Sequence, residues 1–177
     1  MIRNNITPNL QTLETRDCPS ATVIVSNNTL FISSDPASDK IQLRDNGKGR
    51  VDVFIRSHDG VTGTSAFNID RIVMHLRGAT DTVDYKLTRP LSRPLEIRMD
   101  MGSGTGDKVA LDFSKGIRQG ALVVDVRGNI GQGSVQTKIG TIDRGFAVVH
   151  PRFEGSHQKF LIDMPTDTLS RSRVSIS

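Results

Sequence analysis

Three polar residues in turn-forming stretches have the chemistry of calcium ligands: Asp81, Asp107 and Asn129. Asp81 and Asp107 each stand just before a segment in which apolar and polar residues alternate. If those segments stack, Asp81 and Asp107 become neighbours and Asn129 lies one layer further. Calcium takes six to eight oxygen ligands from carboxylates and carbonyls. The sequence therefore allows one weak calcium site, and the alternative is that Asp and Gly serve only as turn formers.

Acidic residues also alternate with apolar ones elsewhere in the chain, and Asp84 and Asp112 are examples. A pair of carboxylates on one face of a stacked fold is the constellation of a glycosidase or polysaccharide lyase. However, such residues are commonly just the solvent face of a strand. The chain has seven Phe, one Tyr and no Trp to hold a sugar ring. We therefore expect no catalytic site and no bound cofactor apart from calcium, and keep the enzyme as the alternative.

Composition and charge restrict the class of protein. The chain has 177 residues, of which 36% are hydrophobic and 24% charged, as in a soluble single domain. The formal net charge of +4 is spread evenly, without the basic block that nucleic-acid binding needs, so we expect no nucleic-acid partner. We also expect no transmembrane segment and no signal peptide. The single cysteine, Cys18, excludes an internal disulfide.

The elements that must position these residues are β-strands. Alternation with a period of two is typical of a strand with one buried face. It recurs along the chain, and no window has the apolar spacing of a helix. The clearest examples are residues 41–44, 51–56, 95–100, 109–113 and 122–127.

The spacing of the strands predicts a repeat. We place the repeat starts at Leu30, Val51, Ile72, Leu95, Leu122 and Val148, which are 21 to 27 residues apart. Each start is followed by a turn, an Asp or Gly, and a second strand. Such a period is typical of a solenoid, here a parallel β-helix-like stack of about six imperfect coils. An antiparallel β-sandwich with frequent hairpins predicts nearly the same pattern and is the alternative.

Two terminal segments fall outside this pattern. Residues 1–20 are polar and unpatterned, so we expect a flexible leader. Residues 21–164 make up the predicted β-repeat domain. Residues 165–177 alternate only weakly, and we expect either a capping strand or a disordered tail.

Residues 13–21, Leu-Glu-Thr-Arg-Asp-Cys-Pro-Ser-Ala, resemble a short element near the start of many planctomycete proteins. That element reads Leu-Glu-x-Arg-x-x-Pro-Ser and occurs in large surface or exported proteins, often ahead of β-rich repeats. The resemblance implies an extracellular or cell-envelope location and a protein or cell-surface partner. With the repeat pattern, it favours a structural or interaction module over an enzyme.

Residues 101–109, Met-Gly-Ser-Gly-Thr-Gly-Asp-Lys-Val, look like one turn of the calcium-binding nonapeptide of repeats-in-toxin β-rolls. This likeness implies that Asp107 and a neighbouring turn share a calcium ion. The units here are longer than nine residues, and the turn that contains Asn129 lacks a carboxylate.

Overall fold

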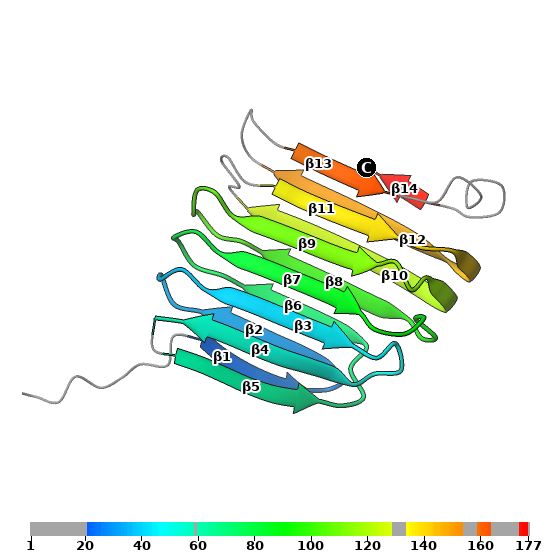
Figure 1. The fold of residues 1–177 in the computed structure, drawn as a ribbon, viewed down its shortest axis with the longest axis horizontal. Helices are drawn as coiled ribbons and strands as arrows, with labels where there is room; N and C mark the ends of the chain where they lie inside the picture. The colour runs from blue at the N-terminus through cyan, green and yellow to red at the C-terminus, as the bar shows by residue number, and fades with distance from the viewer. Residues whose placement is uncertain (1–20, 59, 129–133, 154–158, 164–173, 177) are drawn as a thin grey trace, which may run out of the picture.

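Two seven-stranded β-sheets, each with parallel and antiparallel pairs, make up the fold (Figure 1). The computed structural model describes residues 21–58, 60–128, 134–153, 159–163 and 174–176. Every regular element in these ranges is a strand. The predicted all-β class is therefore confirmed.

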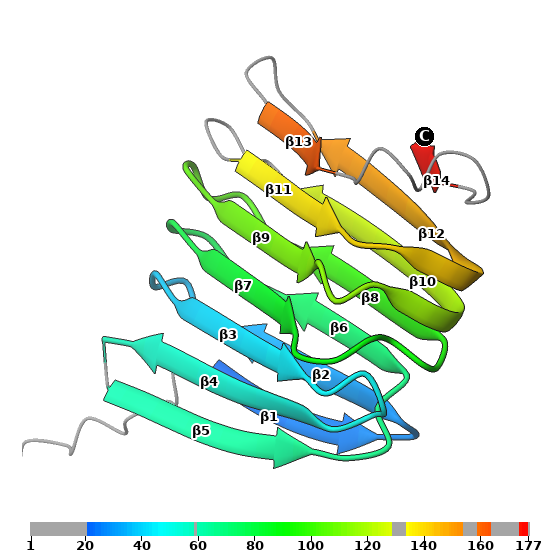
Figure 2. The same cartoon turned by 45° about the vertical axis from the view of Figure 1, so that its right-hand side comes forward.

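The two sheets form two layers that face each other, and the strands of both layers lie along roughly the same axis (Figure 2). In spatial order, sheet A consists of β1 (Ala21–Ser26), β2 (Thr29–Ser34), β6 (Arg71–His75), β8 (Leu95–Asp100), β10 (Ile117–Gly128), β12 (Ile142–Phe153) and β14 (Val174–Ile176). Sheet B consists of β13 (Lys159–Asp163), β11 (Ser134–Ile139), β9 (Lys108–Phe113), β7 (Thr82–Leu87), β3 (Lys40–Asp45), β4 (Val51–Ser57) and β5 (Gly60–Ala66).

From β6 onward the chain passes alternately between the sheets, and from β8 onward each strand lies parallel to the previous strand of its own sheet. This parallel register places apolar residues on apolar residues. One such column in sheet A is Leu30, Ile72, Ile97, Val124 and Val149. All five are buried, so the core lies between the sheets.

Antiparallel pairs occupy the N-terminal end of both sheets. β1 and β2 form a hairpin whose two turn residues, Asn27 and Asn28, have φ of 47° and 59°. Positive φ at both positions is the signature of the tight turn that joins twisted antiparallel strands. In sheet B, β4 pairs antiparallel with β3, and β5 pairs antiparallel with β4. Thus β1 and β5 are the edge strands at this end (Figure 1).

Three of the predicted repeat starts need correction. Ile72 pairs with Ile97, so Leu95 lies two residues before the position that continues the column of Leu30 and Ile72. Val51 begins β4, which turns back beside β3 in sheet B and does not continue the column of Leu30 and Ile72. Val148 is displaced by one position, because Leu122 pairs with Ala147, which is buried. A shift of one residue exchanges the faces of a strand, so Ala147, and not Val148, faces the core beside Leu122.

The predicted segments outside the domain are described only in part. Residues 1–20 lie outside the described ranges, and with them the predicted leader. Of residues 165–177, the structure describes β14, which pairs parallel with β12 and extends sheet A. The two-sheet arrangement thus combines parallel neighbours, as in the coil prediction, with hairpins, as in the sandwich alternative.

Candidate functional site

Three aspartates stack at the turns that enter sheet B, and we call Asp39, Asp81 and Asp107 the aspartate ladder. Each immediately precedes a strand, β3, β7 or β9, and each is buried. The backbone N–H of Asp39 donates to Oδ1 of Asp81 at 2.9 Å. The N–H of Asp81 donates in the same way to Oδ1 of Asp107 at 2.8 Å. Side chains therefore link successive turns across the stack.

Burial perturbs the charge of this ladder. It raises the pKa of Asp81 to about 6, with smaller upward contributions from the charges of Asp107 and Asp39. The hydrogen bond from the Asp39 amide opposes this shift. Burial also raises the pKa of Asp107. The Oδ2 atoms of Asp81 and Asp107 are buried without a hydrogen-bond partner, so the ionised forms are poorly solvated.

The turns themselves pack closely enough to fix this geometry. The hydroxyl of Thr80 donates to the carbonyl oxygen of Thr105 at 2.7 Å. A Cβ at Gly104 would lie 1.7 Å from the carbonyl oxygen of Ala79. Only glycine permits this approach between the backbones, which explains the glycine-rich turn before Asp107.

The predicted calcium site is brought together in part. Asp81 and Asp107 are adjacent, as expected, whereas Asn129 lies outside the described residues. Within the described ranges, no group of three or more His, Cys, Asp or Glu side chains is arranged to hold a metal ion. Calcium binding therefore stays a prediction. Asp39 is a third member of the aspartate ladder that the calcium hypothesis did not contain, although Ser38-Asp39-Lys40-Ile41 parallels Thr80-Asp81-Thr82-Val83.

A second buried polar cluster joins three distant segments. Oδ2 of Asp45 accepts hydrogen bonds from the Tyr85 hydroxyl at 2.8 Å and from Nη2 of Arg93 at 2.6 Å. Its Oδ1 accepts from the N–H of Gly47 at 2.6 Å. Burial, and then the charge of Asp45, raise the pKa of Tyr85 well above its usual value. The cluster ties the 88–94 loop to sheet B, which is a structural role.

The two outward carboxylates weighed as a glycosidase pair, Asp84 and Asp112, are diagonal neighbours on the adjacent strands β7 and β9. Asp84 lies in register with Ala110 and Gln42, whereas Asp112 lies in register with Lys86 and Lys138. Burial pushes the pKa of Asp112 upward, but hydrogen bonds from Ser114 and the two lysine charges outweigh it and lower the pKa. A general acid needs the opposite shift.

The outer face of sheet A carries paired charges. Arg71 lies 2.7 Å from Glu96, and Arg127 lies 2.7 Å from Asp125. Arg98 forms a second ion pair with Glu96. Cations and carboxylates thus alternate across this face.

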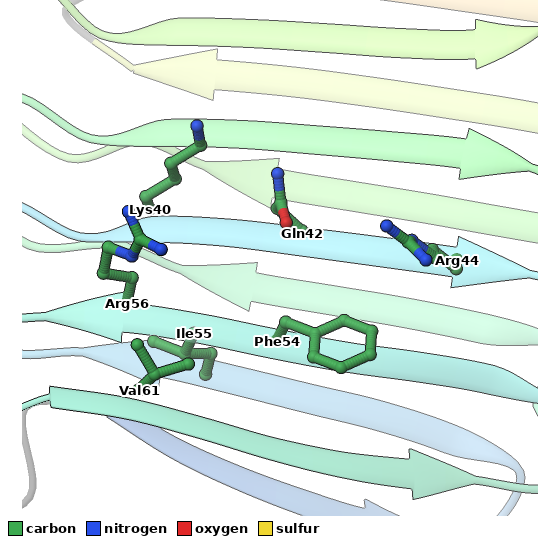
Figure 3. Close-up of a pocket in the computed structure, with 7 residues that line it drawn as sticks. All are labelled: Lys40, Gln42, Arg44, Phe54, Ile55, Arg56 and Val61. Carbon is green, nitrogen blue, oxygen red and sulfur yellow. The ribbon is translucent and has the colours of Figure 1, made fainter.

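The outer face of sheet B is different at its N-terminal end. A groove there is lined by Lys40, Gln42, Arg44, Phe54, Ile55, Arg56 and Val61, which we call the cationic groove (Figure 3). It contains three basic side chains, and no carboxylate of the described residues lines it. Sequence analysis missed this site because β3, β4 and β5 are separate in the sequence pattern and meet only through the hairpins.

Comparisons with protein-family models, curated proteins and solved structures found no match to this chain. Among the described residues, no helix is long and apolar enough to cross a membrane.

Proposed function

We propose that this chain is a non-catalytic β-solenoid module of the bacterial envelope or exterior, which presents a rigid surface to a protein or cell-surface partner. In this reading, β2–β3, β6–β7, β8–β9, β10–β11 and β12–β13 are successive coils, and the hairpins β1–β2 and β4–β5 cap the N-terminal end.

The observation that carries the proposal is the parallel register maintained through both sheets. In sheet B, Ile41, Val83, Val109 and Val135 lie in one line of Cα partners. Each coil buries its apolar face on its neighbours, which is the way solenoids gain stability. The aspartate ladder continues the same repeat through the turns. A rod built in this way offers long, regular outer faces for binding.

Two further points support an interaction role. Residues 13–21 resemble the element of planctomycete surface and exported proteins, which favours the envelope or exterior. The outward carboxylates Asp52 and Asp112 have lowered pKa values, owing to the Ser65 hydrogen bond at Asp52 and to Ser114 and lysine charges at Asp112, in both cases against the effect of burial. Carboxylates held ionised suit a solvated binding face better than acid catalysis.

Binding and turnover are separated by incubating the full chain with envelope preparations from a planctomycete. We expect the protein to sediment with the envelope material and to release neither reducing ends nor unsaturated sugars. The folded protein centrifuged without envelope material serves as the control for sedimentation on its own. Release of sugar products would contradict the proposal and favour the glycosidase or lyase. Failure to sediment would contradict a role at the envelope.

A further inference from the structure

We propose that the cationic groove of sheet B binds an acidic polysaccharide through the carboxylate or sulfate groups of the sugar chain. This inference rests on the proposed function, because it names the partner of the interaction module. The groove lies on the outer face of β3 and β4 and is bordered by β5 (Figure 3).

The groove places like charges together. Lys40 of β3 is the direct cross-strand partner of Arg56 of β4. Both side chains are exposed, and no ion pair among the described residues involves either of them. Like charges directly opposite each other destabilise an antiparallel pair. An anion bound between Lys40 and Arg56 would offset this repulsion, which gives the like-charge pair a role in binding.

Arg44 extends the positive charge along the strand. It lies on the same face of β3 as Lys40, four residues further on, at about 13 Å for an extended strand. Its neighbour in β7 is Lys86, a second pair of like charges in register, whereas its partner in β4 is Asp52, which also pairs with Arg50. The cations therefore occupy both ends of the groove, and one small anion cannot span them. A chain with repeated negative groups can.

The centre of the groove offers a flat apolar surface between these charges. Phe54 of β4 lies opposite Gln42 of β3, and its side chain is 39% exposed. The Arg44 guanidinium lies 5.6 Å from the centre of the Phe54 ring, which holds it beside the groove. An aromatic ring next to an amide is suited to the apolar face and hydroxyl groups of a sugar.

On the outer face of sheet A, by contrast, exposed arginines form ion pairs with carboxylates. On sheet A, Arg71 and Arg98 pair with Glu96, and Arg127 pairs with Asp125. These pairs neutralise the cations within the protein. In contrast, no such ion pair among the described residues involves Lys40 or Arg56.

Charge further along sheet B favours a polysaccharide over a nucleic acid. Beyond the groove, β7 and β9 present Asp84 and Asp112 on the same outer face, where they alternate with Lys86 and Lys108. A nucleic-acid backbone that continued across the sheet would meet these carboxylates, and its affinity depends on many phosphate contacts. A polysaccharide that fills only the short groove and stacks a sugar on the Phe54 ring avoids these carboxylates.

The test measures binding of the full chain to four probes: polygalacturonate, heparin, single-stranded DNA and neutral dextran. The probe variant is Lys40→Gln with Arg56→Gln. The control variant, Lys115→Gln with Arg118→Gln, removes the same charge from exposed positions outside the groove. We expect polygalacturonate or heparin to bind, and the probe variant to lose at least about tenfold in affinity. The control should lose less than about twofold.

Stability provides a second readout, because removal of the like-charge pair should leave the melting temperature of the probe variant equal or higher. Polygalacturonate carries only carboxylates and heparin carries both groups, so binding of polygalacturonate shows that carboxylates suffice, and binding of heparin alone shows that sulfates are needed. Tighter binding of DNA than of either polysaccharide would overturn the proposal, as would equal losses in both variants. Binding to neither polyanion by a wild-type chain that still sediments with envelope material would overturn the groove proposal alone. Release of sugars would overturn the proposed function instead.

Discussion

Replacement of Asp81 by asparagine should remove a contribution that makes this fold less stable as the pH rises. Asp81 is fully buried, and its Oδ1 accepts the hydrogen bond from the Asp39 amide. Asparagine retains an oxygen for that bond but removes the charge. The change therefore isolates the contribution of the Asp81 carboxylate to the aspartate ladder.

The sign follows from the raised pKa. Burial moves the pKa of Asp81 from 3.8 to about 6, so the folded chain binds a proton more tightly than the unfolded chain. The resulting stabilisation is complete below the unfolded pKa and is lost as the pH rises through about 6. At 1.36 kcal/mol per pKa unit, the loss reaches about 3 kcal/mol at most. The introduced amide also costs about 1–3 kcal/mol if its donors remain unpartnered.

The pH dependence of the difference between the two proteins is independent of that amide cost. From pH 4 to pH 8, the Asp81→Asn variant should gain about 2–3 kcal/mol relative to wild type. For a chain of this size, that gain corresponds to a relative rise in melting temperature of roughly 4–12 °C.

Thermal unfolding followed by circular dichroism, in EDTA so that no bound metal neutralises the ladder, measures this difference. Asp112→Asn is the matched control. The pKa of Asp112 is lowered because Ser114 and the neighbouring lysines outweigh its burial. Its stabilisation is present above the unfolded pKa and lost as the pH falls, so this control should change in the opposite direction. Parallel pH profiles for Asp81→Asn and wild type would refute the reasoning.

Three further predictions concern the packing that holds the sheets and turns. Asp45→Ala should lower the free energy of unfolding in urea by about 3–5 kcal/mol, because it leaves the Arg93 guanidinium without its partner. Tyr85→Phe should cost only about 1–3 kcal/mol, and equal losses would contradict this account. Gly104→Ala should cost about 1–3 kcal/mol, since its Cβ would clash with the Ala79 carbonyl, and an unchanged melting temperature would disprove the close approach. If the turns bind calcium, millimolar calcium should raise the melting temperature by several degrees over EDTA, and an unchanged midpoint would remove that hypothesis.

The strands and their buried faces could be predicted from the sequence, because alternating apolar residues show which face of a strand is buried. Leu95, Ile97 and Met99 alternate with polar residues, and all three are buried as expected. The adjacency of Asp81 and Asp107 could also be predicted, because both immediately precede an alternating segment of similar length. Such inferences need only the period of a strand and the position of its turn.

The partner and direction of a strand are not local properties, and the prediction that Val51 starts a coil was wrong. Val51, Val53 and Ile55 alternate just as a coil strand would, yet β4 runs antiparallel to β3. The short Asn46–Arg50 connection, with Asn46-Gly47 at its start, is a hairpin signal that alternation alone does not contain. The Asp45 cluster was missed for a similar reason. Its partners are 40 and 48 residues away, and no short motif joins them.

The same hairpin explains why the candidate binding groove lies where it does. Parallel stacking places Lys40 beside Thr82 and then Lys108, which keeps the two lysines one strand apart. The antiparallel return of β4 instead places Arg56 directly beside Lys40 and adds the Phe54 ring to the same face. A continuous parallel stack would have neither feature. The antiparallel hairpin at the N-terminal end thus creates the cationic groove. We therefore expect an acidic ligand to bind at this end of sheet B and not along the parallel part of the stack.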